Sequence, residues 1–275
     1  MRAVAVIPAR YGSSRFPGKP LVSLLGKPLI AWVVERARAC PAFAEVVVAT
    51  DHEGIAEAAA AAGARAVRTS AGCRSGTDRV AEAARALAAD VVVNVQGDEP
   101  LVDPADLGAL VAAMEGPEGP AMATLVRPLR DTAEWRRPDV VKVVCDAGGN
   151  ALYFSRSPIP YFRDEAEAAG EARIPADPPA EVWKHLGVYA FTRQALLAFP
   201  GLPEGRLERA ERLEQLRALE AGWRIRVVEA RSDSVGVDRP EDVARVEKLL
   251  AAGRRAARRL GGWGVPGGSQ GPAVS

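Results

Sequence analysis

The sequence lacks several features that would assign it at once to a class of protein. No apolar run approaches the roughly 20 residues needed to span a bilayer, and the N-terminus has no signal-peptide profile. The three cysteines, Cys40, Cys73 and Cys145, are odd in number and form no C-x-x-C pair. This usage argues against a disulfide framework or a zinc site and favours a reducing compartment. We therefore predict a cytoplasmic protein without membrane insertion.

An excess of positive charge is also missing. The chain has 36 Lys and Arg residues against 35 Asp and Glu residues, so no broad basic field is available for nucleic acid. Positive charge must therefore act locally. A G-x-G-x-x-G dinucleotide fingerprint does not occur, which weakens the assignment to an oxidoreductase.

The first half of the sequence alternates short apolar runs with helical stretches. The β-branched runs 3–7, 46–49 and 91–95 are typical of strands buried on both faces of a parallel sheet. Helices are expected between them, so the pattern predicts an α/β fold with a doubly wound, mostly parallel sheet. Ligands of such folds bind beyond the carboxyl ends of the strands.

The second half changes character. Three strands are expected at 122–126, 140–144 and 151–154, followed by a loop or arm over 157–179, a strand over 182–191, a helix over 207–221, a strand over 225–228 and a helix over 241–250. We expect one domain over residues 1–252 with a smaller β-rich insertion at about 122–192. The Gly- and Arg-rich residues 253–275 are expected to form a flexible tail.

The segment "ARYGSSRFPGKP" follows the first predicted strand and has the composition of an anion-binding loop. Its glycines allow backbone N–H groups to face an anion, and Arg15 and Lys19 add positive charge. It is not an ATPase P-loop, because five residues separate Gly12 from Gly18 and because Lys19 is followed by Pro20, which has no hydroxyl.

Two distant carboxylates are candidates for a magnesium site. Asp98 directly follows a strand expected to be central, and Mg²⁺ prefers one or two carboxylates together with phosphate oxygens. Asp238, in "SVGVDRPED", either joins Asp98 at the metal or caps the last helix. For the nearby Glu99 and Asp103, a role in a loop or helix cap is preferred.

Three further motifs have both a functional and a structural interpretation. "AGCRSGTDR" either binds the edge of a base or starts a helix capped at Gly76 or Thr77. His185 is one of two histidines, and a lone histidine on a strand is more often structural than catalytic. In a continuous helix Glu214 would point between Leu207 and Ala210, where a buried acid needs a partner or a ligand.

The motifs together resemble those of one enzyme family. "VIPARYGSSRFPGKPL", "SGTDRVAEA", "NVQGDEPLV", "VKVV", "ALYFSRSPIPY", "HLGVYAF", "LERAERLEQLRALE" and "GVDRPEDV" occur in this order, nearly end to end from Arg2 to about Leu250. They resemble the CMP-KDO synthetases, which are 3-deoxy-manno-octulosonate (KDO) cytidylyltransferases. The resemblance implies that CTP and KDO give CMP-KDO and pyrophosphate, with Mg²⁺ as cofactor, for lipopolysaccharide biosynthesis.

The resemblance also assigns residues by position. It implies that the triphosphate is bound by Arg10, Arg15 and Lys19, and that Arg10, Lys19 and Asp98 are catalytic. The remaining nucleotide-binding residues it implies are Arg74, Ser75 and Gln96, and the metal ligands are Asp98 and Asp238. The sugar-binding residues it implies are Arg156, His185, Tyr189, Glu214 and Gln215.

The resemblance further implies a homodimer that pairs through roughly residues 155–189. Two alternatives stay open at this point. One is a cytidylyltransferase for another keto-deoxy or sialic-acid-like sugar, since the phosphate loop does not distinguish these substrates. The other is a nucleotide-binding regulator that has kept the pocket without the chemistry, against which the presence of Lys19, Asp98 and Asp238 argues.

Overall fold

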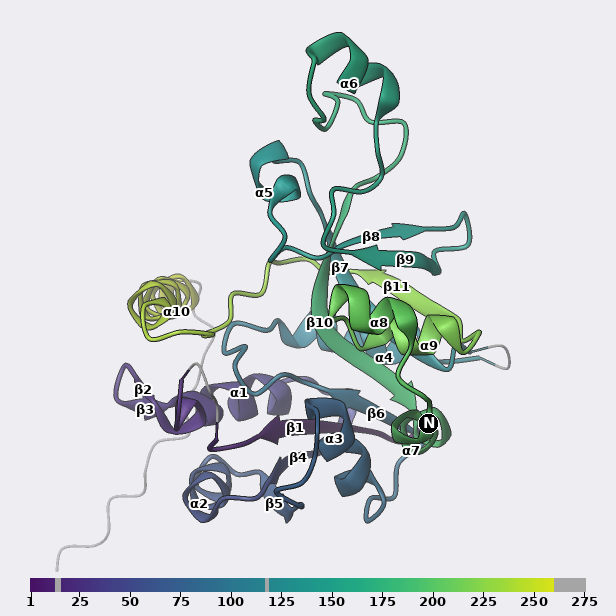
Figure 1. Ribbon diagram of the computed structural model, residues 1–275. Helices are drawn as coiled ribbons and strands as arrows, with labels where there is room; N and C mark the ends of the chain where they lie inside the picture. The colour runs from purple at the N-terminus through teal and green to yellow at the C-terminus, as the bar shows by residue number, and fades with distance from the viewer. Residues whose placement is uncertain (13–15, 117–118, 260–275) are drawn as a thin grey trace, which may run out of the picture.

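A nine-stranded sheet forms the centre of the computed structural model, which describes residues 1–12, 16–116 and 119–259 (Figure 1). Its main path has the order β11-β7-β10-β6-β1-β4-β5, and β8 and β9 extend it from β10. The pairs β1–β4, β1–β6, β4–β5 and β11–β7 are parallel, whereas β10 is antiparallel to β6 and β7. The predicted α/β, mostly parallel fold is confirmed. The strands are β1 (Ala3–Ala9), β4 (Phe43–Thr50), β5 (Arg65–Arg68), β6 (Val91–Asn94), β7 (Met122–Pro128), β8 (Lys142–Cys145), β9 (Ala151–Ser155), β10 (Trp183–Thr192) and β11 (Ile225–Glu229).

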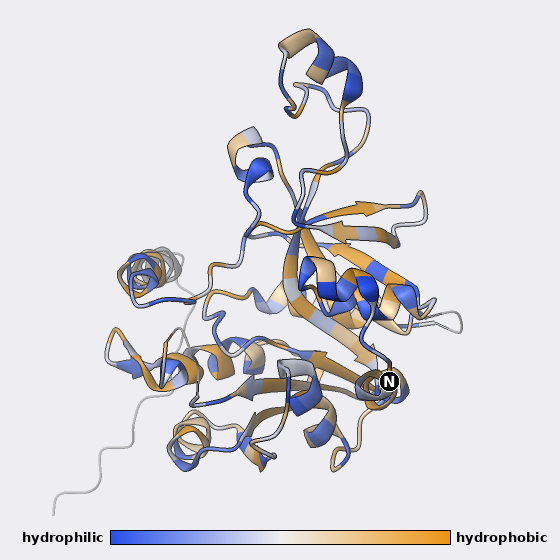
Figure 2. Ribbon diagram, viewed as in Figure 1, coloured by the Kyte–Doolittle hydropathy of each residue, from blue (hydrophilic) through white to orange (hydrophobic). Residues whose placement is uncertain are grey.

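Helices cover both faces of this sheet. Alternate residues of β1 face opposite ways, as the pleat requires: Ala5 and Ile7 belong to one core cluster, and Val4 and Val6 to the other. The strands are therefore apolar on both faces, which Figure 2 shows in orange along β1, β6 and β10. The first cluster includes residues of α1 (Leu29–Arg38), α2 (Glu53–Ala61) and α4 (Pro104–Ala112), and the second includes residues of α3 (Gly76–Ala84), α7 (Arg193–Ala198) and α9 (Gln215–Glu220).

The predicted β-rich insertion divides between the main sheet and a projecting part. Strands β7 and β10 lie inside the main sheet, and the chain between them projects from its end (Figure 1). The projection carries α5 (Thr132–Arg136), the β8–β9 ladder and α6 (Arg163–Ala169). The loop or arm expected over 157–179 lies in this projection, and the structure adds the helix α6 within it. In α6 two acids stand in the first turn and Gly170, at φ 74°, ends the helix.

The helix predicted over 207–221 is broken. It forms α8 (Arg206–Glu211) and α9, with Arg212 between them in a left-handed conformation at φ 55°. The carboxylate of Glu220 on α9 returns to accept hydrogen bonds from the amides of Arg206 (3.0 Å) and Leu207 (3.2 Å) at the start of α8. The break lets the two short helices pack side by side, which a continuous helix excludes.

Two other helix ends differ from their predictions. Ser75, rather than Gly76 or Thr77, is the N-cap of α3, because its hydroxyl accepts from the amide of Asp78 at 3.1 Å. At the other end of the chain, α10 (Asp242–Arg259) continues nine residues beyond the predicted end at Leu250. The remainder of the predicted tail, residues 260–275, lies outside the described residues. Within the described ranges, no helix is long and apolar enough to cross a membrane.

Candidate active site

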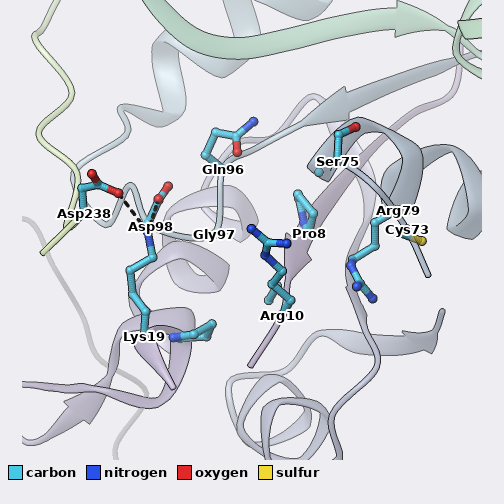
Figure 3. A pocket seen from close by; sticks show the side chains of 13 residues that line it. Pro8, Arg10, Lys19, Cys73, Ser75, Arg79, Gln96, Gly97, Asp98 and Asp238 are labelled. Atoms are coloured by element: carbon cyan, nitrogen blue, oxygen red, sulfur yellow. Dashed lines mark hydrogen bonds and ion pairs between the residues drawn. The ribbon is translucent and has the colours of Figure 1, made fainter. Parts of the chain in front are cut away.

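A cavity of about 370 Å³ lies where the order of the parallel strands changes direction. From β1 the chain builds outward through β4 and β5, then returns to place β6 on the other side of β1. The loops that follow β1 and β6 therefore run in opposite directions, and a crevice opens between them at the carboxyl ends of these two strands. The cavity is lined by Pro8, Ala9, Arg10, Lys19, Pro20, Cys73, Ser75, Gly76, Arg79, Gln96, Gly97, Asp98 and Asp238 (Figure 3).

Lys19 and the two predicted metal ligands converge at one end of this cavity. The Lys19 ammonium lies 2.5 Å from Asp98 Oδ2 and 3.9 Å from Asp238 Oδ1, as the dashed lines in Figure 3 mark. Asp98 follows β6, whereas Asp238 comes from the segment before α10, 140 residues later in the chain. The two carboxylates thus share the Lys19 ammonium, and Asp242, not Asp238, accepts from the amides of Asp238 and Arg239 before α10. The predicted sharing of a metal ion by Asp98 and Asp238 stays a prediction.

This arrangement fits a magnesium ion held with a nucleotide. The described residues contain no cluster of three or more His, Cys, Asp or Glu side chains that could bind a metal alone. Mg²⁺ is usually bound by one or two carboxylates plus substrate phosphates, and Asp98 and Asp238 supply that number. The positive charge of Lys19 between them shows that this point of the cavity already stabilises a cation.

The other predicted nucleotide-binding residues fall into three groups. Arg10, Ser75 and Gln96 line the cavity, and Figure 3 shows the Arg10 guanidinium in its middle. Arg74 is not among the lining residues; its side chain is exposed and pairs with Asp78 at 3.4 Å. Arg15 lies outside the described residues. The predictions for Arg74 and Arg15 stay predictions.

Sequence reasoning missed Arg79, a buried cation in the cavity wall. Its side chain is 3% exposed, and its guanidinium donates to Thr69 Oγ1 at 2.5 Å and to Asp51 Oδ2 at 3.1 Å. Arg79 lies in "SGTDR" and its partner Asp51 lies in "VATDHEG", but nothing in the sequence indicates that these two segments meet. Arg79 thus adds a buried, charge-paired guanidinium to the wall of the cavity.

Gly97 is required by the close approach of two chain segments under the cavity. A Cβ atom at this position would lie 2.7 Å from the carbonyl oxygen of Pro8 at the end of β1. Any other residue would therefore push the turn that carries Asp98 away from the loop that carries Arg10 and Lys19.

A second cavity, of about 430 Å³, lies along β10 and beside the segment that leads to Asp238. Three of the five predicted sugar-binding residues, His185, Tyr189 and Gln215, line it. Tyr189 donates its hydroxyl to Gln215 Oε1 at 3.2 Å, and Gln215 Nε2 is buried with no hydrogen-bond partner among the described residues. A buried amide without an acceptor is costly, so Gln215 is prepared to donate to a ligand oxygen.

His185 is held as a neutral ring with a defined tautomer. Thr124 Oγ1 lies 2.9 Å from His185 Nε2 and 2.9 Å from the carbonyl oxygen of Val188. Because the single hydroxyl proton goes to the carbonyl, His185 Nε2 donates to Thr124 and Nδ1 becomes the acceptor. Burial lowers the pKa of His185 to about 3. At neutral pH the ring therefore offers an acceptor without charge, which suits a sugar hydroxyl better than a carboxylate.

The same shift predicts a loss of stability in acid. In the unfolded chain His185 takes up a proton below its ordinary pKa of 6.5, whereas in the folded protein it does so only near 3. Between these values the unfolded state binds more protons, so the free energy of unfolding falls as the pH falls. His185→Gln should lose less stability than the wild type between pH 6.5 and 4.5, as measured by urea unfolding. From pH 7.5 to 8.5 the two proteins should change in parallel, and equal losses in acid would contradict the assignment.

Arg156 and Glu214 lie outside the lining of the second cavity. The Arg156 guanidinium donates to the carbonyl oxygens of Glu211 at 2.7 Å and Pro138 at 3.0 Å. Glu214 does not point between Leu207 and Ala210 as a continuous helix requires, because the break at Arg212 turns it toward the nucleotide side, where it accepts from the Thr77 hydroxyl. Their roles in sugar binding stay predictions.

The two acids assigned to loop or cap roles behave differently. Asp103 is the N-cap of α4 and accepts from the amide of Ala105 at 2.8 Å, which confirms the prediction. Glu99 caps no helix. It accepts from the Ser234 hydroxyl at 2.7 Å, and burial followed by repulsion from Asp98 raises its pKa to about 7. Sequence alone does not indicate this contact, which spans 135 residues.

A doubly wound sheet, a polar cavity at its switch point and two carboxylates around one cation are features that suit an α/β enzyme acting on a metal-bound nucleotide. The family model for cytidylyltransferases matches residues 4–232. The 3-deoxy-manno-octulosonate cytidylyltransferase of Anaeromyxobacter sp. (strain Fw109-5) is 55% identical over 258 residues, which cover 93% of this chain and 100% of the relative. That of Syntrophobacter fumaroxidans is 52% identical over 254 residues, covering 91% and 98%.

Solved structures agree with this grouping. A CMP:2-keto-3-deoxy-manno-octonic acid synthetase in complex with CTP superposes with a TM-score of 0.84 at 42% identity, covering 92% of this chain and 100% of the other. A nucleotidyl transferase from Methanothermobacter shares the fold, with a TM-score of 0.60 at 18% identity, over 92% of this chain and 99% of its own. The chain belongs to the cytidylyltransferase family and, within it, to the 3-deoxy-manno-octulosonate cytidylyltransferases.

Proposed function

We propose that this protein transfers the cytidylyl group of CTP to 3-deoxy-manno-octulosonate with release of pyrophosphate. The observation that carries the proposal is the position of the Lys19 ammonium, 2.5 Å from Asp98 and 3.9 Å from Asp238, in the switch-point cavity. A cation, two carboxylates and the loop after β1 meet where the phosphates of a nucleotide would bind in this type of fold. The second cavity, lined by hydrogen-bonding side chains of β10, would hold the sugar acid.

The reaction is an in-line displacement at the α-phosphorus of CTP. The anomeric hydroxyl oxygen forms the new bond to phosphorus, the bond from the α-phosphorus to the bridging oxygen breaks, pyrophosphate leaves with that oxygen and its electron pair, and the hydroxyl proton passes to solvent. Transfers of this kind depend on alignment and on stabilisation of negative charge rather than on covalent catalysis. Mg²⁺ held by Asp98 and Asp238 would neutralise phosphate charge and acidify the attacking hydroxyl. Arg10 and Lys19 would stabilise the charge that develops on the phosphoryl oxygens.

The sugar acid would be oriented by neutral and charged groups of the second cavity. His185 Nδ1 would accept from a sugar hydroxyl, and Gln215 Nε2 would donate to a sugar oxygen. The cations that line this cavity are Arg137, Lys184 and Arg245. Arg137 already pairs with Asp139, and Lys184 pairs with Glu134 and Asp233. Arg245 is therefore a candidate partner for the sugar carboxylate in addition to the predicted Arg156, whose guanidinium donors are directed at backbone carbonyls.

The substrate assignment is tested by measuring pyrophosphate release. The enzyme is assayed with CTP and a panel of sugar acids that includes KDO and a sialic acid, and then with KDO and each of the other nucleoside triphosphates. We expect CTP with KDO to give the highest kcat/KM. Faster turnover of another sugar acid would establish the other cytidylyltransferase instead, and tight CTP binding with no turnover would establish a regulator.

His185→Ala should raise the KM for the sugar acid more than the KM for CTP. Removal of one hydrogen bond to the sugar is expected to raise that KM by roughly two- to tenfold. Steady-state kinetics with each substrate varied in turn provide the measurement. A larger effect on CTP would show that the ring belongs to the nucleotide side of the cleft.

A homodimer in the cytoplasm completes the proposal. The projecting part of the chain exposes large side chains, with Leu152 60% and Tyr161 64% exposed, of the kind that a second subunit would cover. Sedimentation of the purified protein distinguishes a monomer from a dimer.

A further inference from the structure

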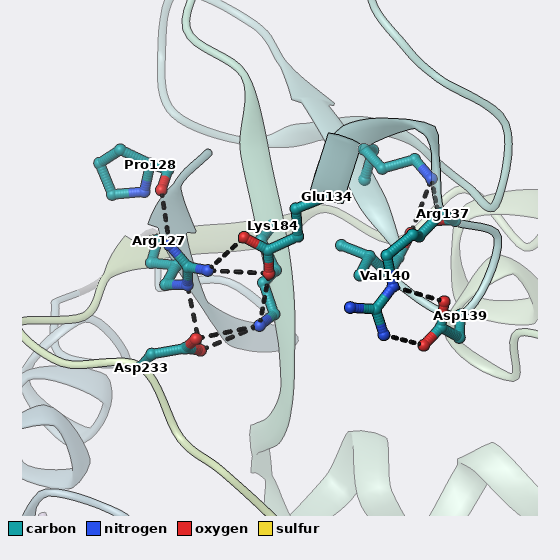
Figure 4. Close-up of polar contacts among 9 residues, drawn as sticks. Arg127, Pro128, Glu134, Arg137, Asp139, Val140, Lys184 and Asp233 are labelled. Carbon is teal, nitrogen blue, oxygen red and sulfur yellow. Dashed lines mark hydrogen bonds and ion pairs between the residues drawn. The ribbon is translucent and has the colours of Figure 1, made fainter. Parts of the chain in front are cut away.

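Four charged side chains form a closed ring of ion pairs at the wall of the second cavity (Figure 4). Arg127 donates to both carboxylate oxygens of Glu134, at 2.9 and 2.7 Å, and its Nε lies 3.0 Å from Asp233. Lys184 Nζ lies 3.1 Å from Glu134 and 3.1 Å from both oxygens of Asp233. Each cation thus contacts both acids, and each acid contacts both cations. We call these four residues the ion quartet.

The ion quartet joins segments that are distant in the sequence. Arg127 is on β7, Glu134 on α5, Lys184 on β10 and Asp233 on the segment after β11. The side chains are 18–34% exposed, so they are partly withdrawn from water. Burial alone would raise the pKa of the Glu134 carboxyl, but the hydrogen bonds from Lys184 and Arg127 together lower it by more, so the pKa lies below its ordinary value and the acid is charged. A paired network of this kind fixes geometry more than it adds stability.

Residues 233–238, here called the clasp, run from the ion quartet to the metal-binding carboxylates. Ser234 donates to Glu99 at 2.7 Å, and the amide of Val237 donates to the carbonyl oxygen of Asp98 at 2.9 Å. A Cβ atom on Gly236 would lie 3.2 Å from that same carbonyl. The clasp therefore lies along the Asp98 turn, and its last residue, Asp238, faces Lys19.

Each end of the clasp is held by carboxylate contacts. At its far end, Asp242 accepts from the amide of Asp238 at 2.9 Å, and Val237 is fully buried in a small core with Val246 and Leu250 of α10. At its near end, the side chain of Asp233 contacts two cations of the ion quartet. Arg127 and Lys184 thus hold the first residue of the clasp, and the contacts of Ser234 and Val237 carry the chain from there to Asp238.

We infer that Arg127 and Asp233 are positioning residues for Asp238, because the ion quartet fixes the start of the clasp and so places Asp238 opposite Asp98. The inference rests on the proposed metal site and deepens it. Arg127 lines neither cavity, so it acts through its partners rather than on a substrate. Because Glu134, Lys184 and Asp233 line the second cavity, the same ring connects the proposed sugar side with the metal side.

The test measures metal binding without turnover. Mn²⁺, as a probe for Mg²⁺, is titrated into the enzyme–CTP complex and followed by electron paramagnetic resonance. Arg127→Gln and Asp233→Asn should each weaken Mn²⁺ binding by about tenfold, the size of coupling typical within a charged network. CTP affinity without metal should stay within twofold of the wild type. Arg127→Lys, which restores the charge but not the bidentate contact, should give an intermediate value.

Two controls separate positioning from a general effect. Arg65→Gln removes a comparable ion pair, 2.7 Å from Glu45, at the opposite edge of the sheet and should leave Mn²⁺ binding unchanged. The double variant of Arg127 and Asp233 should lose no more than the weaker-binding single variant, because both act through one ring. If Arg127→Gln fails to fold, the nearly isosteric Asp233→Asn decides.

Mn²⁺ affinity within twofold of the wild type in both single variants would overturn the inference, as would losses that add in the double variant. The titration also separates this inference from the proposed function. An enzyme that turns over no sugar acid while showing these Mn²⁺ shifts loses the proposed function and keeps the positioning role. An enzyme with normal CTP and KDO turnover but no Mn²⁺ shifts keeps the function and loses the positioning role.

Discussion

Asp98→Asn is expected to abolish turnover while leaving the fold intact. The substitution keeps the shape of the side chain but removes the charge that faces Lys19 at 2.5 Å and that would bind the metal. Mutation of a residue that only hydrogen-bonds a metal ligand typically lowers metal affinity or activity by about 10- to 100-fold. Loss of a direct ligand should therefore lower kcat by more than about 100-fold. The contact that anchors the Asp98 turn to the clasp uses the backbone carbonyl, which the substitution leaves in place.

The measurement is kcat for pyrophosphate release at saturating CTP and sugar acid, together with a thermal melt. Asp103→Asn is the matched control, since Asp103 lies five residues away and caps α4, and asparagine is an equally good N-cap. This variant should keep both kcat and melting temperature. Near-normal activity of Asp98→Asn would remove Asp98 from the metal site.

Lys19→Met is expected to lose kcat by about 10²–10³-fold, which corresponds to about 2.7–4 kcal/mol for one charge-stabilising donor in an active site. Lys19 contacts the carboxylates of Asp98 and Asp238, yet it lies in the loop whose composition suits phosphate. Methionine fills a similar volume without the charge, so the effect reports the ammonium group rather than packing.

A second readout sharpens this prediction. Because the Lys19 ammonium occupies the position between the two carboxylates, a metal ion must compete with it. Lys19→Met should therefore bind Mn²⁺ in the absence of CTP at least as tightly as the wild type, even though kcat falls. Lys27→Met, which removes a cation paired with Glu35 at 2.5 Å, is the control and should change neither quantity. An effect confined to the sugar KM would show that Lys19 does not serve the phosphates.

The fold could be predicted where local pattern and tertiary structure agree. The buried parallel strands are continuous β-branched runs, and the end of such a strand fixes where the next loop must lie, so the meeting of Lys19 and Asp98 at one cavity could be expected from the sequence. Asp238 could be placed only as one of two alternatives, because nothing local distinguishes a metal ligand from a helix cap. The structure brings it to Lys19 through the clasp.

The predictions were wrong or incomplete where contacts between distant segments decide the structure. The helix over 207–221 breaks at Arg212, Glu220 returns to accept from the amide of Arg206 at the start of α8, and Glu214 faces Thr77. Arg79 becomes part of the nucleotide cavity only when Asp51 and Thr69 are folded against it. No periodicity or spacing within one segment carries such information, since each element's own pattern is compatible with either arrangement.

The reversed direction of β10 separates the two sides of the proposed reaction along the chain. Strand β10 is antiparallel to its neighbours β6 and β7. Its N-terminal half, rather than its C-terminal end, therefore lies at the edge of the sheet where ligands bind. The residues proposed to bind the sugar acid therefore come mainly from the chain after residue 128. The residues proposed to bind the triphosphate come mainly from the first hundred residues. A substitution on the sugar-acid side can therefore change the preferred acceptor without altering a residue of the triphosphate loop, provided that the ion quartet stays paired.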